Sequence, residues 1–439
     1  MSINVIGAGL AGCEAAWQIA KRQIPVKLYE MKPNKKTPAH HSDDFAELIC
    51  SNSLKADRVA SAAGLLKEEM RRTGSLLIEC ADKCRVPAGG ALAVDRNIFS
   101  KSVTEKIKSH PLITVISEEV TKIPDNGITI IATGPLTSDE LSENIGKQFD
   151  NSLSFFDAAA PIVTFESIDM SNAFFASRYG KGEGDDYINC PMDKDEYTLF
   201  YNELINAERT PLHNVDVANP KVYEGCMPVE IMASRGENTL RFGPMKPVGL
   251  TNPKTGHRPW AVLQLRKENS TGTLYNLVGF QTNLRFPEQK RVFGLIPALK
   301  NADFVRYGVM HRNTFLDSPR LLNSDFSTKK NNNLFFAGQI TGVEGYMESA
   351  SSGMTAGINA ARLYKGLETV TYPKCTMTGA LSRYISDSTV TKFQPMGANL
   401  GILPELSNRP RDKAERARLY AERSLEELEA FFKEFNILE

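Results

Sequence analysis

The feature that most constrains the fold of this chain is a glycine-rich turn behind a short apolar strand near its start. Residues 3–6 predict the strand, and a helical pattern follows the turn. The turn consists of Gly7, Ala8, Gly9, Leu10, Ala11 and Gly12. A second predicted strand covers residues 26–29 and ends on Glu30, eighteen residues past Gly12. This order of strand, turn, helix, strand and acid is typical of a dinucleotide-binding unit.

Each part of this unit has a mechanical role in holding a dinucleotide. We expect Gly7 to allow the tight turn, Gly9 to let the backbone approach a pyrophosphate, and Gly12 to let helix and strand pack closely. The N-terminus of the helix offers unpaired N–H groups and a partial positive charge to the phosphates. Glu30 is placed to bind a ribose through its carboxylate.

Length and composition indicate a globular protein of two domains. The 439 residues exceed what one hydrophobic core usually fills. A hydrophobic share of 41% and a charged share of 24% are ordinary for a globular chain. There is no apolar run long enough to span a membrane, and the apolar N-terminus lacks the basic leading region of a signal peptide. We therefore expect no membrane association and no secretion.

The cysteines indicate a reducing compartment. There are seven, an odd number without close pairs of the metal-binding type. This pattern predicts reduced thiols, no metal site and a cytoplasmic location. Cys80 and Cys84 are four residues apart, which is the spacing of one helix face, and we interpret them as core thiols.

The net charge is zero, but the charged residues are unevenly distributed. Residues 139–230 hold 18 Asp and Glu against 6 Lys and Arg, whereas residues 231–330 hold 16 Lys and Arg against 6 Asp and Glu. This asymmetry can form a basic face on a neutral protein. The alternative is that the two segments pair with each other inside one domain, and charge alone does not decide between the two.

The middle of the chain differs in character from the first part. After the opening unit we expect a helical stretch over 64–72, a helix over 96–109, and strands over 112–116 and 127–133. Gly134 follows the last of these strands among small residues, as expected where a chain passes close beneath a cofactor. From about residue 146, acidic loops and short alternating strands, as in FDAAAPIVTF, DEYTLFYNEL and LYNLVGFQTNL, predict an inserted α+β domain.

Near residue 331 the first pattern resumes. Residues 334–337 predict a buried strand, the turn AGQITGVEGY follows, and a helix is expected to start near Ser349. The last thirty residues predict an amphipathic packing helix. We therefore predict an α/β fold: a Rossmann-like FAD-binding domain of the glutathione-reductase type, built from residues 1–145 and 305–439, around an inserted α+β domain of residues 146–304.

The second glycine-rich turn is expected to approach the ribityl chain and the ring of FAD. Gly338 opens this turn, and Gln339 stands where such folds often carry an acid. Glutamine can still form a hydrogen bond with a ribityl hydroxyl group, so the cofactor prediction stands.

Three strings of residues resemble the folate- and FAD-dependent tRNA (uracil-5-)-methyltransferase family. They are PAHHSDDFAELICSNSLK, EGCMPVEIMASRGENTLRFGPMKPVGL and LFFAGQITGVEGYMESASSG. The resemblance covers essentially the whole chain, including FQPMGANLGILP near the C-terminus. The third string is also similar to that of the larger tRNA wobble-uridine-modifying flavoproteins, but this chain shows no counterpart of their C-terminal extension.

The resemblance implies a reaction in which a thiolate adds to carbon 6 of uracil and makes carbon 5 nucleophilic. It implies that Cys226 is this nucleophile and that Cys50 removes the proton from carbon 5, although the two assignments could be exchanged. Methylenetetrahydrofolate is the implied carbon donor, reduced FAD the implied reductant, and NAD(P)H a co-substrate. The product would be 5-methyluridine in the T loop of tRNA.

The resemblance also places Tyr346 near the isoalloxazine ring and makes His311 a candidate to stack on the folate pterin. Because phosphates dominate binding to nucleic acids, the tRNA partner favours a basic face, and the target uridine must be everted to react. The candidates for that face, with Arg285 singled out for substrate binding, are Arg235, Arg241, Lys246, Arg258, Arg285, Lys290 and Arg291. His40 and His41 are either phosphate contacts or plain loop residues.

Three other functions compete with this one. The first is an NAD(P)H-dependent flavin oxidoreductase acting on a small molecule, which would need no basic face. The second is a wobble-uridine-modifying flavoprotein. The third is a flavoprotein that has lost catalysis and binds RNA, which the presence of both cysteine motifs disfavours.

Overall fold

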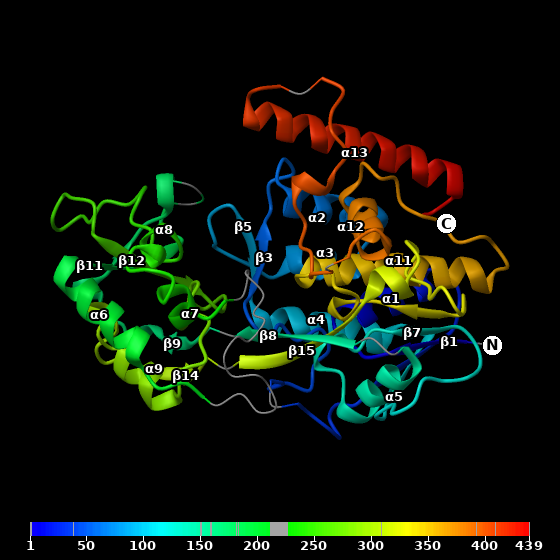
Figure 1. Cartoon of the computed structure of the whole chain (residues 1–439), viewed down its shortest axis with the longest axis horizontal. Helices are drawn as coiled ribbons and strands as arrows, with labels where there is room; N and C mark the ends of the chain where they lie inside the picture. Colours follow the sequence, from blue (N-terminus) through cyan, green and yellow to red (C-terminus); the bar gives the residue numbers. More distant parts are fainter. Residues whose placement is uncertain are drawn as a thin grey trace.

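The computed structural model describes residues 2–37, 39–149, 152–158, 160–180, 182, 184–210, 227–308, 310–391, 393–408 and 410–438, with the backbone alone for 152–158 and 311–314. Two bodies lie side by side (Figure 1): the larger holds both ends of the chain, and the smaller holds the middle. Strands β8 (Ser152–Ala158) and β15 (Met310–Leu316) run antiparallel to each other where the chain passes between the two bodies.

The larger body is built on a five-stranded parallel sheet in the order β16-β7-β1-β2-β6. Its strands are β1 (Ile3–Ile6), β2 (Val26–Glu30), β6 (Ile113–Ser117), β7 (Thr129–Ile131) and β16 (Leu334–Phe336). Four of them come from the first third of the chain and β16 from its last third. The predicted Rossmann-like domain built from both ends of the chain is therefore confirmed.

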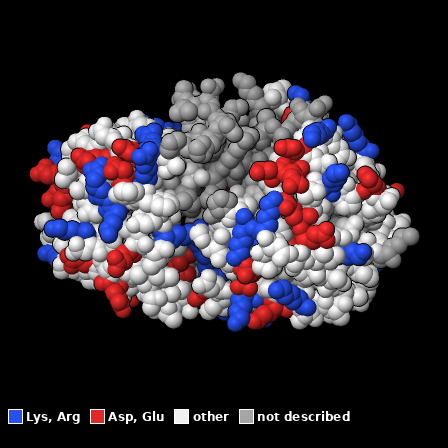
Figure 2. Space-filling model, turned by 90° about the horizontal axis from the view of Figure 1, so that it is seen from below, with Lys and Arg blue, Asp and Glu red and all other residues white. Residues whose placement is uncertain are grey.

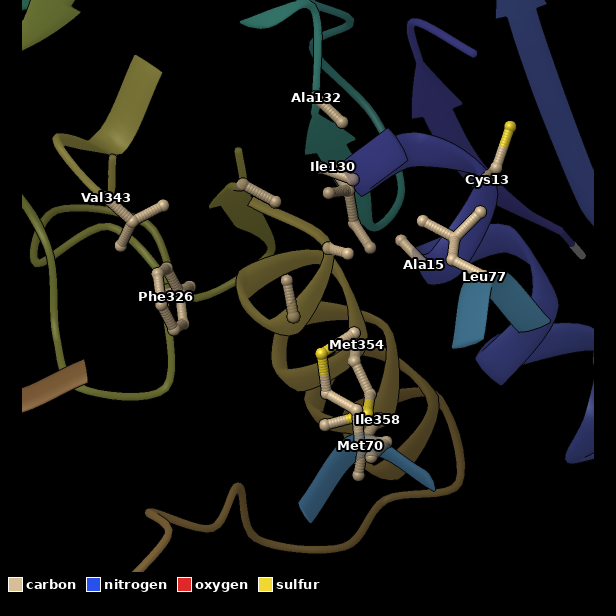
Figure 3. Close-up of a cluster of buried hydrophobic side chains, with 14 of the residues drawn as sticks. Cys13, Ala15, Met70, Leu77, Ile130, Ala132, Phe326, Val343, Met354 and Ile358 are labelled. Atoms are coloured by element: carbon tan, nitrogen blue, oxygen red, sulfur yellow. The ribbon is translucent and has the colours of Figure 1, made fainter. Parts of the chain in front are cut away.

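Helices α1 (Leu10–Lys21) and α11 (Tyr346–Tyr364) join the two ends of the chain. A side chain at Gly353 would lie 2.1 Å from the carbonyl oxygen of Ala11, and one at Gly357 would lie 2.7 Å from that of Ala15. The two backbones therefore touch, which only glycine at these positions permits. Figure 3 shows the apolar side chains that gather around this contact, among them Cys13, Ala15, Met354 and Ile358. Helix α11 begins at Tyr346 and not near Ser349 as expected.

The remaining elements of the larger body surround the sheet. A small antiparallel sheet, β3-β5-β4, consists of Ser53–Ala56, Ala91–Val94 and Arg85–Val86. The helices are α2 (Ala62–Thr73), α3 (Leu76–Lys83), α4 (Arg96–Ser109), α5 (Asp139–Phe149), α10 (Ser318–Leu321), α12 (Met377–Ser386) and α13 (Lys413–Phe435). Glu69 is fully buried and accepts hydrogen bonds from the Met377 and Thr378 N–H groups and from the Ser424 hydroxyl. This carboxylate thus fastens α12 and α13 to α2.

The smaller body is an antiparallel sheet of six strands with helices. The order is β10-β11-β12-β13-β9-β14, with Phe174–Phe175, Tyr187–Met192, Ala261–Lys267, Leu274–Leu277, Ile162–Thr164 and Phe304–Arg306. Its helices are α6 (Lys194–Asn206), α7 (Val229–Ala233), α8 (Thr239–Phe242) and α9 (Phe286–Phe293). The predicted inserted α+β domain is therefore present.

One predicted strand in this domain is wrong. The string DEYTLFYNEL lies in helix α6, because Asp193 and Glu196 form a reciprocal capping box at its start. Tyr197, Phe200 and Leu204 are the buried residues of α6, and they fall on one helix face. Aromatic residues at this spacing, preceded by a capping pair, favour a helix over an alternating strand.

Each body has its own hydrophobic core. The buried apolar residues of the larger core run to Phe149 and resume at Phe315. Those of the smaller core run from Val163 to Ala302. The domain limits 1–145, 146–304 and 305–439 stay predictions. Because strand β14 (Phe304–Arg306) pairs with β9 in the sheet of the smaller body, we assign Arg306 to the inserted domain. Among the described residues, no helix is both long enough and apolar enough to cross a bilayer.

Candidate active site

The glycine turn after β1 is shaped by backbone contacts. Gly7 has a φ of +97°, and a side chain there would lie 2.8 Å from the Ala132 carbonyl oxygen. A side chain at Gly12 would lie 1.7 Å from the Gly7 carbonyl oxygen. A side chain at Gly9 would meet no atom within 4 Å, so this backbone faces open space. Among the described residues, no side chain caps the N-terminus of α1 at Gly9, which leaves its N–H groups available to a ligand.

Glu30 closes the turn from the end of β2. Its carboxylate accepts hydrogen bonds from the Ala8 N–H at 2.8 Å and from the Lys32 N–H at 3.0 Å. The side chain is almost fully buried. The acid predicted to bind a ribose therefore lies directly against the glycine turn.

The turn opens into a cavity of two connected parts. The larger part extends from Gly9 to Cys50 and Tyr346. The smaller part extends from Gly9 to Glu30. Both are lined by Gly9, His40, Thr133 and Leu136. The result is one long cleft with Glu30 at one end and Cys50 at the other.

The second glycine-rich turn borders the same cleft. Gly338 and Gln339 line its larger part, as does Gly134. A side chain at Gly134 would meet no atom within 4 Å, so its backbone, like that of Gly9, is open to a ligand. The Gln339 amide nitrogen donates a hydrogen bond to Glu344 at 2.6 Å, which fixes the side chain within the turn.

Tyr346 holds the loop that carries Cys50. The Tyr346 hydroxyl oxygen accepts hydrogen bonds from the Cys50 N–H at 2.7 Å and the Ser51 N–H at 3.1 Å. Burial, and then the adjacent Cys50, raise the pKa of Tyr346 well above its usual value, so the hydroxyl stays protonated. Cys50 itself is half-buried and lines the cavity. The two residues are thus brought together from opposite ends of the chain.

The other predicted catalytic thiol, Cys226, lies outside the described residues. The segments on either side of it are anchored to one stretch of chain. The Thr210 N–H donates to the Asn283 carbonyl oxygen at 2.8 Å, and the Val229 N–H donates to that of Gln281 at 2.7 Å. His311 lies in β15 opposite Asp157 of β8, and its side chain is likewise outside the described residues.

Several members of the predicted basic face have acidic or aromatic partners. Arg285 forms an ion pair with Glu208 at 2.9 Å, and Arg291 pairs with Glu203 and Glu288. The Arg241 guanidinium lies 3.6 Å from the centre of the Trp260 ring. Arg285 does not line the cleft among the described residues. Figure 2 shows basic and acidic side chains mixed over the face that it presents.

The two histidines differ in position. His40 lines both parts of the cleft, and its Nδ1 lies 2.9 Å from the Thr37 hydroxyl oxygen. Burial and the nearby Lys32 lower the pKa of His40, so the ring is neutral at pH 7. His41 does not line either part among the described residues.

A group of charged residues that was not predicted from the sequence surrounds the Cys50 loop, which we define as residues 48–52. Arg96 comes from α4, whereas Arg266, Glu268 and Arg306 come from the inserted domain. All four are buried or half-buried. Their spacing along the chain does not indicate that these four side chains lie close together, because they come from two different domains.

The fold and the cleft define a two-domain dinucleotide-binding protein with a cysteine at one end of its cofactor cleft. A family model described as Glucose inhibited division protein A matches residues 2–368. The Methylenetetrahydrofolate--tRNA-(uracil-5-)-methyltransferase TrmFO of Acetivibrio thermocellus is 61% identical over 99% of this chain and 99% of that protein. The protein of the same name from Ligilactobacillus salivarius is 57% identical over 98% of both. The chain belongs to the GidA family and, within it, to the group of TrmFO proteins.

Solved structures agree with this fold. GidA of Aquifex aeolicus in its form II crystal superposes with a TM-score of 0.68 at 17% identity, over 99% of this chain and 76% of that chain. The form I crystal gives a TM-score of 0.67 at 16% identity. At these identities the similarity shows the fold alone.

Proposed function

We propose that this protein methylates carbon 5 of the T-loop uridine of tRNA, with methylenetetrahydrofolate as carbon donor and reduced FAD as reductant. One observation carries the proposal: the cleft that starts at the glycine turn ends at Cys50. A reactive thiol at the end of a dinucleotide cleft suits a reaction that needs both a redox cofactor and attack on a pyrimidine. Full-length relatives that carry the TrmFO name support it.

The residues of the cleft fit FAD. The open backbones at Gly9 and Gly134 leave room for the pyrophosphate and the ribityl chain, and the start of α1 would bind the phosphates. Glu30 would hold the adenosine ribose, whereas Gln339 and Tyr346 would border the ring. When bound, FAD supplies the reducing equivalents of the reaction. The protein contributes binding, orientation and the exclusion of water.

The two thiols divide the remaining chemistry. Cys226 is the proposed nucleophile at carbon 6 of uracil, and Cys50 is the proposed base that takes the proton from carbon 5. The position of Cys50 on the cleft supports its part. Glu230, four residues after Cys226, is buried and accepts hydrogen bonds from the Thr282 hydroxyl and the Asn283 N–H, both at 2.8 Å. This anchor holds the described chain that follows Cys226 against residues 282 and 283.

The proposed partners are tRNA, methylenetetrahydrofolate and NAD(P)H. We propose that His311 contacts the folate and that Arg285 contacts the tRNA. The proposed location is the cytosol. In keeping with this, the described cysteines form no disulfide; they are Cys13, Cys50, Cys80, Cys84, Cys190 and Cys375. Cys80 and Cys84 are buried core residues.

A single reconstitution tests the function. Purified FAD-loaded protein is incubated with unmodified tRNA, methylenetetrahydrofolate and NADPH, and the digested tRNA is analysed by mass spectrometry. We expect 5-methyluridine at the T-loop position. Absence of this nucleoside in the presence of flavin-loaded enzyme would refute the proposal. NADPH oxidation that proceeds equally without tRNA would favour the small-molecule oxidoreductase instead.

A variant tests the nucleophile. We expect Cys226→Ala to abolish turnover and to keep the flavin absorbance, because the residue acts on the uracil and not on the cofactor. Cys190→Ala is the matched control, since that thiol is fully buried in the inserted domain away from the cleft. Near-normal activity in Cys226→Ala would show that the nucleophile is another residue.

A further inference from the structure

The Cys50 loop is held by arginines from both domains. Arg96, at the start of α4, donates from Nη1 to the carbonyl oxygens of Leu48 and Ile49 at 2.6 and 3.2 Å. Arg306, the last residue of β14, donates from Nη2 to the Ile49 carbonyl oxygen at 2.8 Å. Two guanidinium groups therefore meet at the peptide directly before Cys50.

A third arginine holds the other side of the loop. Arg266 of β12 donates to the Ser51 hydroxyl oxygen at 2.8 Å and to the Asn52 side-chain oxygen at 3.0 Å. The Asn52 amide in turn donates to the carbonyl oxygens of Val94 and Lys267. Arg266 is only 6% exposed. The Cys50 loop is thus one of the points at which the inserted domain is fastened to the cofactor domain.

The charges around the loop do not balance. Glu268 is the carboxylate that the structure brings to these arginines, and its Oε1 lies 2.6 Å from the Arg96 Nε. Among the described residues, three guanidinium groups against one carboxylate leave an excess of positive charge around the loop. Two buried nitrogens, Arg96 Nη2 and Arg306 Nε, have no hydrogen-bond partner among the described residues.

The other titratable groups near the loop do not restore the balance. The Glu47 carboxylate accepts from the His41 N–H at 2.8 Å and pairs with Lys32 at 3.7 Å, so its charge is already compensated. Burial and the adjacent Arg306 lower the pKa of His41, which keeps its ring neutral at pH 7. Tyr346 also stays neutral, as does His40.

Burial is the largest effect on the pKa of Arg306 and lowers it, whereas a negative charge on Cys50 raises it. The Arg306 guanidinium and a Cys50 thiolate therefore attract each other. A thiolate near a guanidinium group is stabilised, and the effect is largest where water is excluded. The same field reaches Tyr346, whose pKa is lowered by Arg96 and raised by Cys50. The Cys50 thiol and the Arg306 guanidinium are therefore within electrostatic range of each other, and Arg96 acts on the same Tyr346 hydroxyl that Cys50 affects.

We propose that Arg306 and Arg96 are positioning residues that hold the Cys50 loop and favour the thiolate form of Cys50, so that the inserted domain supplies part of the charge that makes this thiol reactive. The inference rests on the proposed function only in its choice of Cys50 as a working residue. It implies that the thiol gains its reactivity when the two domains are packed together.

The test is the pH dependence of Cys50 alkylation in the FAD-loaded protein. Short pulses of iodoacetamide are applied between pH 5 and pH 10, and the Cys50 peptide is quantified by mass spectrometry. We expect Arg306→Met to raise the midpoint of the alkylation curve by about one pH unit. Arg306→Lys keeps the charge and should stay close to the wild-type midpoint. Glu268→Gln removes the opposing charge and should lower the midpoint by about half a unit.

The opposite signs of these shifts separate charge from loss of structure. Damage to the loop would move Arg306→Met and Glu268→Gln in the same direction, and that result would overturn the proposal, as would an unchanged midpoint in both. Arg291→Met is the matched control, because Arg291 is an exposed, ion-paired arginine of the same domain. If Arg306→Met does not fold, the sign of the Glu268→Gln shift decides. The alkylation assay contains no tRNA or folate, so its result can be interpreted even if the protein does not methylate tRNA.

Discussion

The glycine turn and the Cys50 loop line the same cleft but are held in different ways. The turn is held mostly within the first thirty residues, by its own backbone and by Glu30, and Gly7 also packs against the backbone of Ala132. The Cys50 loop is fixed by Tyr346 from the last third of the chain and by Arg266 and Arg306 from the inserted domain. The cofactor end of the cleft is thus a local structure, whereas the thiol end depends on the packing of distant parts.

This difference predicts how each end responds to substitution. Damage to the turn should remove the cofactor and destabilise the large domain together. Damage to the contacts of the loop should leave the cofactor in place and change the thiol. The following variants test that separation, from the largest expected effect to the smallest.

Gly12→Ala should have the largest effect. The added methyl group would lie 1.7 Å from the Gly7 carbonyl oxygen, so α1 has to move away from β1. We expect loss of flavin absorbance and a destabilisation of about 3 kcal/mol, seen as a lower apparent melting temperature. Gly90→Ala is the control, because a side chain there meets no atom within 4 Å. Normal flavin content in Gly12→Ala would refute the local account of the turn.

Tyr346→Phe should have an intermediate effect. It removes the acceptor of the Cys50 and Ser51 N–H groups, which costs about 1–3 kcal/mol for each group left unsatisfied. We expect retained flavin, a lower melting temperature and a tenfold or greater loss of methylation. Tyr384→Phe is the control, since its hydroxyl donates to a single carbonyl, that of Gln394, in a partly exposed position. Loss of flavin in Tyr346→Phe would show that the two ends of the cleft are not separable.

Arg285→Met should affect stability little. Its ion pair with Glu208 is about half exposed, and such pairs contribute about 0–1 kcal/mol. If Arg285 binds tRNA as we propose, the variant should raise the KM for tRNA and lower the salt dependence of binding by about one counterion. If the KM and the salt dependence are both unchanged, Arg285 does not bind tRNA and only forms the ion pair with Glu208.

His40→Gln should have the smallest effect, visible as a change of pH dependence. Burial and Lys32 lower the pKa of His40 in the folded protein, so the unfolded chain takes up this proton first as the pH falls. The neutral ring therefore contributes stability above about pH 6.5 that is lost as the pH falls toward the lower folded pKa. We expect the melting temperature of His40→Gln to change less between pH 5 and pH 7 than that of the wild type. His257→Gln, at an exposed position, should show the wild-type pH dependence. Equal slopes in His40→Gln and the wild type would contradict this.

The opening unit could be predicted because it depends on neighbours in sequence. The discontinuous cofactor domain could be predicted because the pattern of strand, glycine-rich turn and helix recurs near residue 331. Spacing alone placed Gly7, Gly12 and Glu30. The string DEYTLFYNEL shows where such reasoning went wrong: its alternation suggested a strand, whereas the capping pair Asp193 and Glu196 and the burial of one face make it a helix. Local capping outweighed the alternation.

The sequence by itself determined the βαβ unit, the position of its acid and the return of the chain to the same sheet, because these rest on backbone geometry and periodicity within short segments. Only the tertiary structure decided which side chains surround Cys50. Arg96 and Tyr346 reach the Cys50 loop from distant parts of the cofactor domain, and Arg306 reaches it from the inserted domain, which β8 and β15 connect to the cofactor domain. Charge and burial act through space, so their effect on a thiol depends on the packing of distant segments and not on the order of residues.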